Sequence, residues 1–206
     1  MNLLRASAKG DLETVKQLLS EGADVNAMDM HGRTSLVEAS WNGRMEVAEL
    51  LIKNGADVNA SDSAGYTALM RASEEGHHSL VKILIKNGAD VNARGKVRGT
   101  TSLMLAAENG HNKIIGSLLD NGASVNAIDQ YEETALTRAY HANQTEAAEL
   151  IESKGGRGKP ERNAFTISDK DLKPYTKATV PQWSAAASED LGFEEESPVD
   201  GFEEQE

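Results

Sequence analysis

The chain of 206 residues contains no cysteine, and this absence excludes several kinds of site. Without thiols there can be no disulfide, no cysteine-ligated zinc and no thiol nucleophile. No apolar run approaches the roughly 18 residues of a membrane-spanning helix. The first six residues have neither the apolar core nor the cleavage site of a signal peptide. We therefore expect a soluble, cytoplasmic protein that is not bound to a membrane.

Positive charge is scarce as well. Lys and Arg number 21 against 33 Asp and Glu, which gives the chain a net charge of −12. Nucleic acids and anionic membranes both repel such an acidic chain. We therefore expect neither of them as a partner.

Proline and phenylalanine are missing from residues 1–155, whereas four prolines and three phenylalanines follow residue 159. Charge is divided too, because each part carries a net −6 and residues 178–206 hold nine acids and no base. The Gly-Gly-Arg-Gly-Lys-Pro run from residue 155 has the composition of a linker. These shifts predict a folded domain at 1–155, followed by a linker and acidic tail at 156–206 that is disordered unless bound.

Residues 1–155 are built from an internal repeat. Asn-Gly-Ala-Asp-Val-Asn-Ala stands at 54–60, and copies of it, some slightly changed, recur at offsets of 33 and 34 residues. A second block, Gly-x-Thr-x-Leu, stands at 32–36 and recurs in phase with the first. One such unit is too small to bury its own apolar face, so the period indicates a stacked array.

Each period predicts two short helices, and the expected fold class is therefore all-α. In the second unit the first helix spans residues 33–41, with Thr34 suited to cap its start and Gly43 to end it. The second helix spans residues 45–53, where apolar side chains recur on one face, and Asn54-Gly55 ends it.

The recurring Asp-x-x-Gly-x-Thr-x-Leu-x-x-Ala and Gly-Ala-Asp-Val-Asn-Ala motifs resemble the ankyrin repeat. The resemblance covers about residues 2–155. It implies a solenoid of stacked helix pairs whose projecting hairpin loops, or fingers, form with the inner helices a concave surface that binds proteins. The five units that it implies run 2–28, 29–61, 62–94, 95–128 and 129–155.

The sequence departs from the family pattern in three ways. The Pro and His of the family's Thr-Pro-Leu-His motif are missing from every copy of the motif in this chain. We therefore expect lower stability than in an idealised ankyrin array. The fourth unit has one extra residue and no leading Asp, which predicts a longer or differently shaped finger at 95–99. In the fifth unit Glu132 and Asn143 replace glycines, and the second helix is polar, as suits a terminal unit that faces water.

The resemblance also implies which residues bind a partner, namely the variable hairpin positions and the exposed face of each first helix. Three of the four aromatic residues in 1–155 fall at these positions, and Trp and Tyr are enriched at binding hot spots. The alternative for Trp41 is that it covers a neighbouring helix. The candidate residues are Met30, His31, Arg33, Trp41, Asn42, Tyr66, Glu74, Glu75, Arg94, Lys96, Arg98, Glu108, Asn109, Tyr131 and His141.

Arg94, Lys96 and Arg98 form a basic cluster within an acidic chain. The cluster is either a solvated finger or a site that recognises an acidic segment of a partner or of this protein's own tail. Three cations release too few counterions to suggest a DNA site.

The sequence offers no support for a metal or catalytic site. His77 and His111 follow a glycine at the same place in consecutive units, so we interpret both as structural, and we expect His78 to be exposed beside His77. No paired-His spacing suggests zinc. Neither a phosphate-binding lysine loop nor a Gly-x-Ser-x-Gly or His-Glu-x-x-His motif is present. We therefore expect no metal, no cofactor and no enzymatic activity.

The acidic tail carries a repeated motif of its own. Gly-Phe-Glu-Glu at 192–195 recurs at 201–204. Either the repetition is chance, or Phe193 and Phe202 are docking anchors, with Trp183 as a third. In the second case each Phe enters an apolar hole while the acids meet a basic rim, and two copies raise the apparent affinity.

Our main hypothesis is a non-catalytic protein–protein interaction module, an adaptor or scaffold that is monomeric on its own. The concave face binds one protein, and the tail binds a second, basic surface or the same partner elsewhere. Two alternatives stay open: an inhibitor or immunity-type protein that masks a basic enzyme surface, and an assembly factor or chaperone. Deleting residues 181–206 should abolish the activity of an inhibitor and only weaken that of an adaptor.

Overall fold

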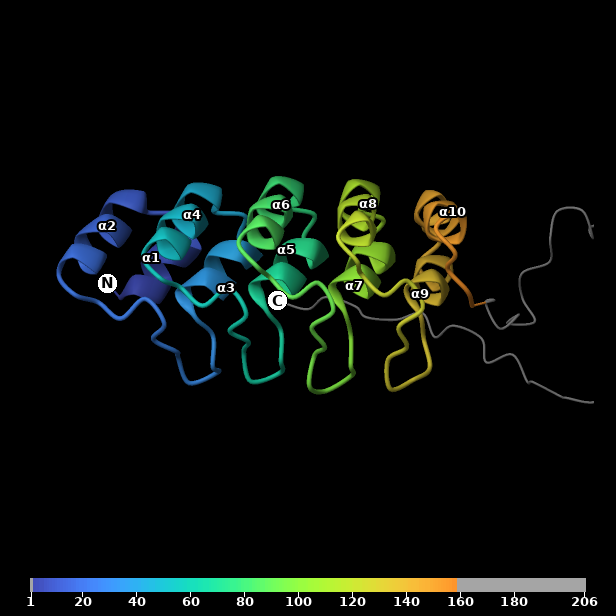
Figure 1. The fold of residues 1–206 in the computed structure, drawn as a ribbon. Helices are drawn as coiled ribbons and strands as arrows, with labels where there is room; N and C mark the ends of the chain where they lie inside the picture. The colour runs from blue at the N-terminus through green and yellow to red at the C-terminus, as the bar shows by residue number, and fades with distance from the viewer. Residues whose placement is uncertain (1, 159–206) are drawn as a thin grey trace, which may run out of the picture. The chain divides into compact units, whose positions relative to one another are not determined.

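The computed structural model describes residues 2–158, and these form ten α-helices in five pairs (Figure 1). Each predicted unit contains one pair, which confirms the predicted all-α array. The tail positions Trp183, Phe193 and Phe202 lie outside the described residues. The first helices of the pairs are α1 (Leu3–Lys9), α3 (Ser35–Trp41), α5 (Ala68–Glu74), α7 (Ser102–Glu108) and α9 (Ala135–His141), and the second helices are α2 (Leu12–Ser20), α4 (Met45–Lys53), α6 (His78–Lys86), α8 (Asn112–Asp120) and α10 (Thr145–Ser153).

The helices lie in two rows (Figure 1). The first helices form an inner row, the second helices form an outer row, and the hairpin loops project from the side of the inner row. Each helix packs against its own pair partner and against the next helix of its row. Neighbouring units therefore bury the apolar faces that a single unit would leave exposed.

A threonine caps the start of four of the inner helices. The Thr34 hydroxyl accepts a hydrogen bond from the Val37 N–H, and Thr67, Thr101 and Thr134 repeat this contact one unit apart. Thr34 itself is extended, so α3 begins at Ser35, two residues later than predicted. The predicted helix at 45–53 agrees with α4. The Gly-x-Thr-x-Leu block is thus a helix-start signal.

The core is built from aliphatic side chains of moderate size and contains no aromatic ring among the buried residues. Alanines on the inner helices, which have no exposed surface, let neighbouring helices approach closely, and one buried leucine per unit fills the space between them. Burial of each leucine contributes roughly 1.5–3 kcal/mol. The equivalent residues are Ala39, Ala72, Ala106 and Ala139, with Leu36, Leu69, Leu103 and Leu136.

A ladder of asparagines joins the units on the side of the Gly-Ala-Asp-Val-Asn-Ala turns. The Asn59 Nδ2 donates to the Gly88 carbonyl at 3.0 Å, and its Oδ1 accepts from the Asp90 N–H at 2.8 Å. Asn26, Asn92 and Asn126 repeat both contacts. The last of these contacts involves the N–H of Arg157, two residues beyond position 155. The domain boundary at 155 stays a prediction. Since each side chain satisfies two backbone groups of the next unit, the recurring Asn is structural.

The fifth unit holds two residues other than glycine in the left-handed region. Glu132 has φ 61° and Asn143 has φ 57°, whereas the equivalent Gly32 and Gly43 have φ 71° and 66°. The backbone thus keeps the turn although the glycine is gone. Asn tolerates this region better than most residues, so the strain is greater at Glu132.

Glu132→Gly should therefore raise the free energy of unfolding by ~1 kcal/mol, since glycine carries no penalty at positive φ. Asn143→Gly should raise it by less. Urea denaturation of the full chain measures both changes. A loss of stability on Glu132→Gly would contradict this account of the turn.

Candidate functional site

Hairpin loops at residues 29–33, 62–66, 95–100 and 129–133 project from the described array, and we call them the fingers (Figure 1). Each is closed by a hydrogen bond from its first N–H to its last carbonyl, and the finger of the fourth unit contains one residue more than the others. The predicted change in that finger is therefore confirmed. We call the fingers, their preceding residues and the exposed inner-helix side chains beside them the finger face.

Backbone hydrogen bonds join the fingers side by side. An N–H of one finger donates to a carbonyl of the preceding finger at 2.9 Å in three places: Ser63 to His31, Lys96 to Ala64, and Gln130 to Arg98. These bonds hold the finger backbones in one register before any partner binds, so binding orders little main chain.

A carboxylate at the start of a finger shapes its turn. In the second unit the Asp29 Oδ1 accepts hydrogen bonds from the His31 N–H at 2.8 Å and the Arg33 N–H at 3.0 Å. Asp62 and Asp129 make the same pair of contacts in their own fingers. The leading Asp is therefore structural, and the fourth unit, which has Gly95 there, closes its finger without it.

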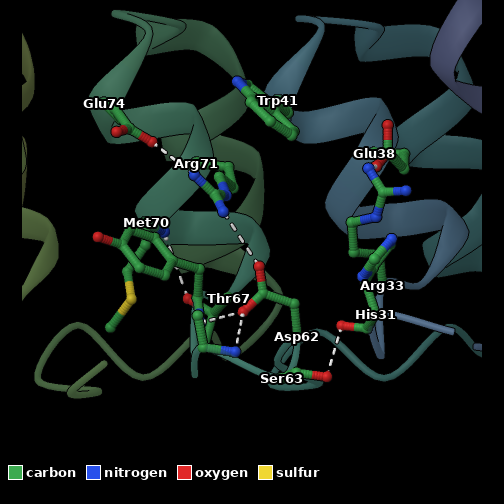
Figure 2. Close-up of polar contacts among 12 residues, drawn as sticks. His31, Arg33, Glu38, Trp41, Asp62, Ser63, Thr67, Met70, Arg71 and Glu74 are labelled. Carbon is green, nitrogen blue, oxygen red and sulfur yellow. Dashed lines mark hydrogen bonds and ion pairs between the residues drawn. The ribbon is translucent and has the colours of Figure 1, made fainter. Parts of the chain in front are cut away.

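An arginine on α5 organises the first side-chain cluster of the finger face (Figure 2). The Arg71 guanidinium lies 3.1 Å from Asp62 Oδ2 and 3.0 Å from Glu74 Oε2. It also lies 4.5 Å from the ring centre of Trp41 and 4.1 Å from that of Tyr66, so it interacts with both aromatic faces. These two rings, expected to bind a partner, are thus also held by contacts within the protein.

Trp41 reaches across two units. Its indole Nε1 donates to Glu75 Oε1 at 3.0 Å, and 36% of its surface is exposed. It therefore covers part of the neighbouring helix, as the alternative interpretation held, while still offering surface to a partner.

A second arginine, on α9, organises the cluster at the other end of the face. Arg138 lies 2.7 Å from both Glu108 and Asp129 and 3.5 Å from Glu133, and its side chain is almost fully buried. Burial would lower the pKa of the Arg138 guanidinium, but the hydrogen bond to Asp129 and the field of Glu108 raise it. Burial would likewise raise the pKa of Asp129, and the bond from Arg138 lowers it. The cluster therefore stays charged on both sides.

The second unit satisfies its carboxylates differently. Arg33 Nη2 lies 2.7 Å from Asp29, and Arg33 Nη1 lies 2.7 Å from Glu38, which occupies the helix position that Arg71 holds in the third unit. In the fourth unit, Gly95 replaces the Asp and Leu105 replaces the Arg. The buried acid and its cation are thus absent together, which leaves no uncompensated charge there.

A hollow of about 550 Å³ opens beside the Arg138 cluster. Tyr131 is 60% exposed at its edge, with the Arg98 guanidinium 5.9 Å from the ring centre. The hollow is lined by Arg98, Glu108, Tyr131, Glu133, Arg138, His141 and Ala142. It brings together four of the predicted binding residues, Arg98, Glu108, Tyr131 and His141, from two units.

Large exposed apolar side chains gather on this face. Of the residues described, the exposed large hydrophobic ones lie on a finger, directly before one, or at the end of α3. Met30 is the extreme, at 90% exposed. The set is Met28, Met30, Trp41, Val97, Ile128 and Tyr131.

A search against protein-family models matches a model described as ankyrin repeats, in three copies, to residues 3–95 and 93–160. The chain belongs to the ankyrin-repeat family. Ankyrin repeats serve generally as protein–protein interaction modules and are typically not catalytic. No curated protein matches the chain significantly.

The ankyrin array exposes most of the predicted binding residues. Arg33, Tyr66 and Glu74 are half-buried. The side-chain amides of Asn42 and Asn109 donate to the carbonyls four residues earlier, on α3 and α7, and Arg94 donates to the Ile128 carbonyl. The exposed candidates are Met30, His31, Trp41, Asn42, Glu75, Arg94, Lys96, Arg98, Glu108, Asn109, Tyr131 and His141. Sequence reasoning missed Arg71 and Arg138.

The histidines of the ankyrin framework have structural contacts. His77 Nε2 lies 3.2 Å from the Trp41 carbonyl, and His111 Nε2 lies 3.0 Å from the Glu74 carbonyl. Each carbonyl belongs to the last residue of the inner helix in the preceding unit. This confirms their structural interpretation. The prediction for His78 is wrong, because it is half-buried and its Nε2 lies 3.0 Å from Ser117 Oγ on α8.

Residues 2–158 contain no group of three or more His, Asp or Glu side chains placed to hold a metal ion. Within the same range, no helix has the combination of length and apolar character that a membrane span requires.

The Asp29 carboxyl should titrate with a pKa of about 2. Burial alone would raise its pKa, but hydrogen bonds from the Arg33 side chain and from the Arg33 and His31 N–H groups outweigh burial. Because the folded pKa lies below the usual ~3.9, the ionised group stabilises the fold above pH ~4, and this contribution is lost as pH falls to ~2.

Carboxyl NMR titration measures this pKa directly. Asp29→Asn should also flatten the loss of stability over that pH range. An Asp29 pKa near 3.9 would show that its hydrogen bonds do not favour the charged form.

Proposed function

We propose that this protein is a non-catalytic adaptor that binds a protein partner on its finger face. The observation that carries the proposal is the concentration of exposed Met, Val, Ile, Trp and Tyr side chains on that face. When a partner removes exposed apolar groups from water, the free energy of the complex falls. The generic role of ankyrin repeats in protein binding supports the same conclusion.

Trp41, Tyr66 and Tyr131 are the aromatic anchors in this proposal. Arg71 contacts the rings of Trp41 and Tyr66, so binding orders few new rotamers at these two residues and loses little entropy there. Charged groups lie around each ring, which favours a partner with both apolar and charged side chains.

Tyr131 and Met30 provide the cleanest test, because their exposed side chains contribute little to the core. Met30→Ala with Tyr131→Ala should reduce capture of the partner from native lysate at least tenfold, since each anchor contributes on the order of 1–2 kcal/mol. The circular dichroism spectrum should stay helical. A matched control is Lys16→Ala with Glu46→Ala on the outer row. If the parent protein, the Met30/Tyr131 variant and the control variant capture the partner equally, the finger face is not the binding surface.

The acidic tail is a second docking element in this proposal, with Trp183, Phe193 and Phe202 as its anchors and a basic surface as its target. The repeated Gly-Phe-Glu-Glu and the nine acids after residue 177 support it. Deleting residues 181–206 should weaken partner capture without abolishing it, whereas complete loss would favour an inhibitor. We further propose that the protein acts in the cytoplasm, as a monomer that binds no nucleic acid.

A further inference from the structure

The outer row carries a basic surface at its centre. Of the outer helices described, α6 has no Asp or Glu, whereas α2, α4, α8 and α10 have at least one each. Lys82 and Lys86 project from α6, Lys53 lies on α4 and Lys113 on α8, and all four are exposed. We call these four lysines the outer lysine patch. It contrasts with a chain whose net charge is −12.

Two grooves flank α6, and both reach Lys86. The first, of about 360 Å³, lies against α4 and has Ile52 and Ile83 as half-buried apolar residues, with Glu49, Lys53, Lys86 and Asn87 around them. The second, of about 330 Å³, lies against α8 and is lined by Lys82, Ile85, Lys86, Ser117 and Asn121. Each groove thus combines half-buried isoleucine surface with a cationic edge.

The lysines of the patch have no carboxylate partner within the described residues, since none of the four forms an ion pair there. Lysines elsewhere on the outer row differ, because Lys16 pairs with Glu13 and Lys154 with Asp120. One acid, Glu49, lies in the first groove, so the second groove is the more strongly positive.

His78 lies in the electrostatic field of two lysines of this patch, Lys82 and Lys113. Its imidazole lies beside Ser117, a residue of the second groove. Burial lowers the pKa of His78, and the charges of Lys82 and Lys113 lower it further. The histidine therefore senses lysine charge that no neighbouring acid cancels.

We propose that the two grooves beside α6 form a second protein-binding surface, which takes an acidic segment of a partner through bulky apolar side chains in the grooves and carboxylates on the outer lysine patch. Charge complementarity selects the occupant, because four unpaired lysines favour a segment rich in Asp and Glu. This surface lies on the opposite helix row from the fingers (Figure 1), so it is independent of the function proposed above.

The shape favours a peptide over a membrane or a nucleic acid. Grooves between ridges accept separate side chains, whereas a bilayer presents an even surface. Repulsion from the chain's net −12 opposes both a phosphate backbone and an anionic bilayer at long range. A short acidic segment makes local contacts and carries far less charge.

The test uses the full chain and a fluorescent 14-residue peptide that alternates Glu with Leu or Phe. Anisotropy should show binding that weakens with salt. Lys53→Glu with Lys86→Glu should lower the affinity ~30-fold, because acids replace both lysines of the first groove and one of the two lysines of the second. The matched control, Lys16→Glu with Lys154→Glu, makes the same charge change on the same row and should lower it less than ~3-fold.

His78 provides a second, local measurement. Proton NMR resolves its titration among the five histidines of the chain, with His78→Gln for assignment. Saturating peptide should raise the His78 pKa, because bound carboxylates offset the charges of Lys82 and Lys113. A peptide bound at the fingers would leave it unchanged.

Several results would overturn the proposal. Equal losses in the two double variants would mean that net charge alone attracts the peptide. An unchanged His78 pKa would place the peptide elsewhere. Binding that emerges only after Phe193→Ala with Phe202→Ala would make the chain's own tail the occupant. Tighter binding to vesicles of anionic lipid than to the peptide would make a membrane the target.

Discussion

Replacing Arg138 with Met should destabilise the protein by ~3–5 kcal/mol, the largest loss that we expect from a single substitution. The side chain of Arg138 is 8% exposed, and the carboxylate that it binds, on Asp129, is fully buried. Met fills a similar volume but leaves Asp129 without its cation, and Glu108 and Glu133 also lose their partner. Urea denaturation of the full chain measures the change.

Two further variants isolate the cause. Arg98→Met removes an exposed arginine of the same face and should cost less than ~0.5 kcal/mol. Combining Arg138→Met with Asp129→Asn should recover part of the lost stability, because the stranded charge is gone. A single Arg138→Met variant within ~1 kcal/mol of the parent would show that the cluster is not needed for stability.

Gly65→Ala should have the second-largest effect, a loss of ~3 kcal/mol. The residue has φ +84°, and an added Cβ would collide with the backbone nitrogen of Lys96 on the next finger. That N–H donates to the Ala64 carbonyl, so the collision also disturbs a bond between fingers. Thermal or urea unfolding provides the measurement.

Gly55→Ala separates the clash from the backbone strain. Gly55 has nearly the same φ, +87°, but its Cβ would meet no atom within 4 Å. Only the penalty of positive φ remains, and the expected loss is ~1 kcal/mol. Equal losses of stability at the two positions would mean that the fingers move apart freely. That result would contradict the finding that backbone hydrogen bonds hold the fingers together.

Much of the array could be predicted from the sequence because its signals are local and repeated. The Gly-x-Thr-x-Leu block fixes a finger end, a helix cap and a core leucine within five residues, and it recurs in phase. The bounds of α4 were predicted correctly since Gly43 and Gly55 lie close to each end. Within residues 2–158, the loss of glycine at Glu132 and Asn143 marks the residues other than glycine that have positive φ.

The side-chain clusters could not be predicted in the same way, because they join residues from different helices and units. Arg71 and Arg138 lie on first helices, where the family pattern predicts exposed binding positions, but both side chains are largely buried beside acids. A signal did exist. Each follows a leading Asp by nine residues, and the fourth unit loses both members of the pair.

The error at His78 has a related origin. The sequence places His78 directly after His77, a histidine of the repeat framework, and nothing in that pattern indicates which way the His78 side chain points. The first turn of α6 instead directs His78 toward α8, where it meets Ser117, 39 residues away. Contacts between outer helices depend on the rotation of each helix, which a short apolar pattern does not specify.

Site-specific photocrosslinking tests the central claim, partner binding on the finger face, most directly. Because the chain lacks cysteine, a single introduced thiol can carry a benzophenone without background labelling. Val97→Cys, on a finger, should crosslink one partner in native lysate, whereas Glu46→Cys, on α4 of the outer row, should not crosslink the same partner. Crosslinking of that partner from position 46 and not from position 97 would contradict the account.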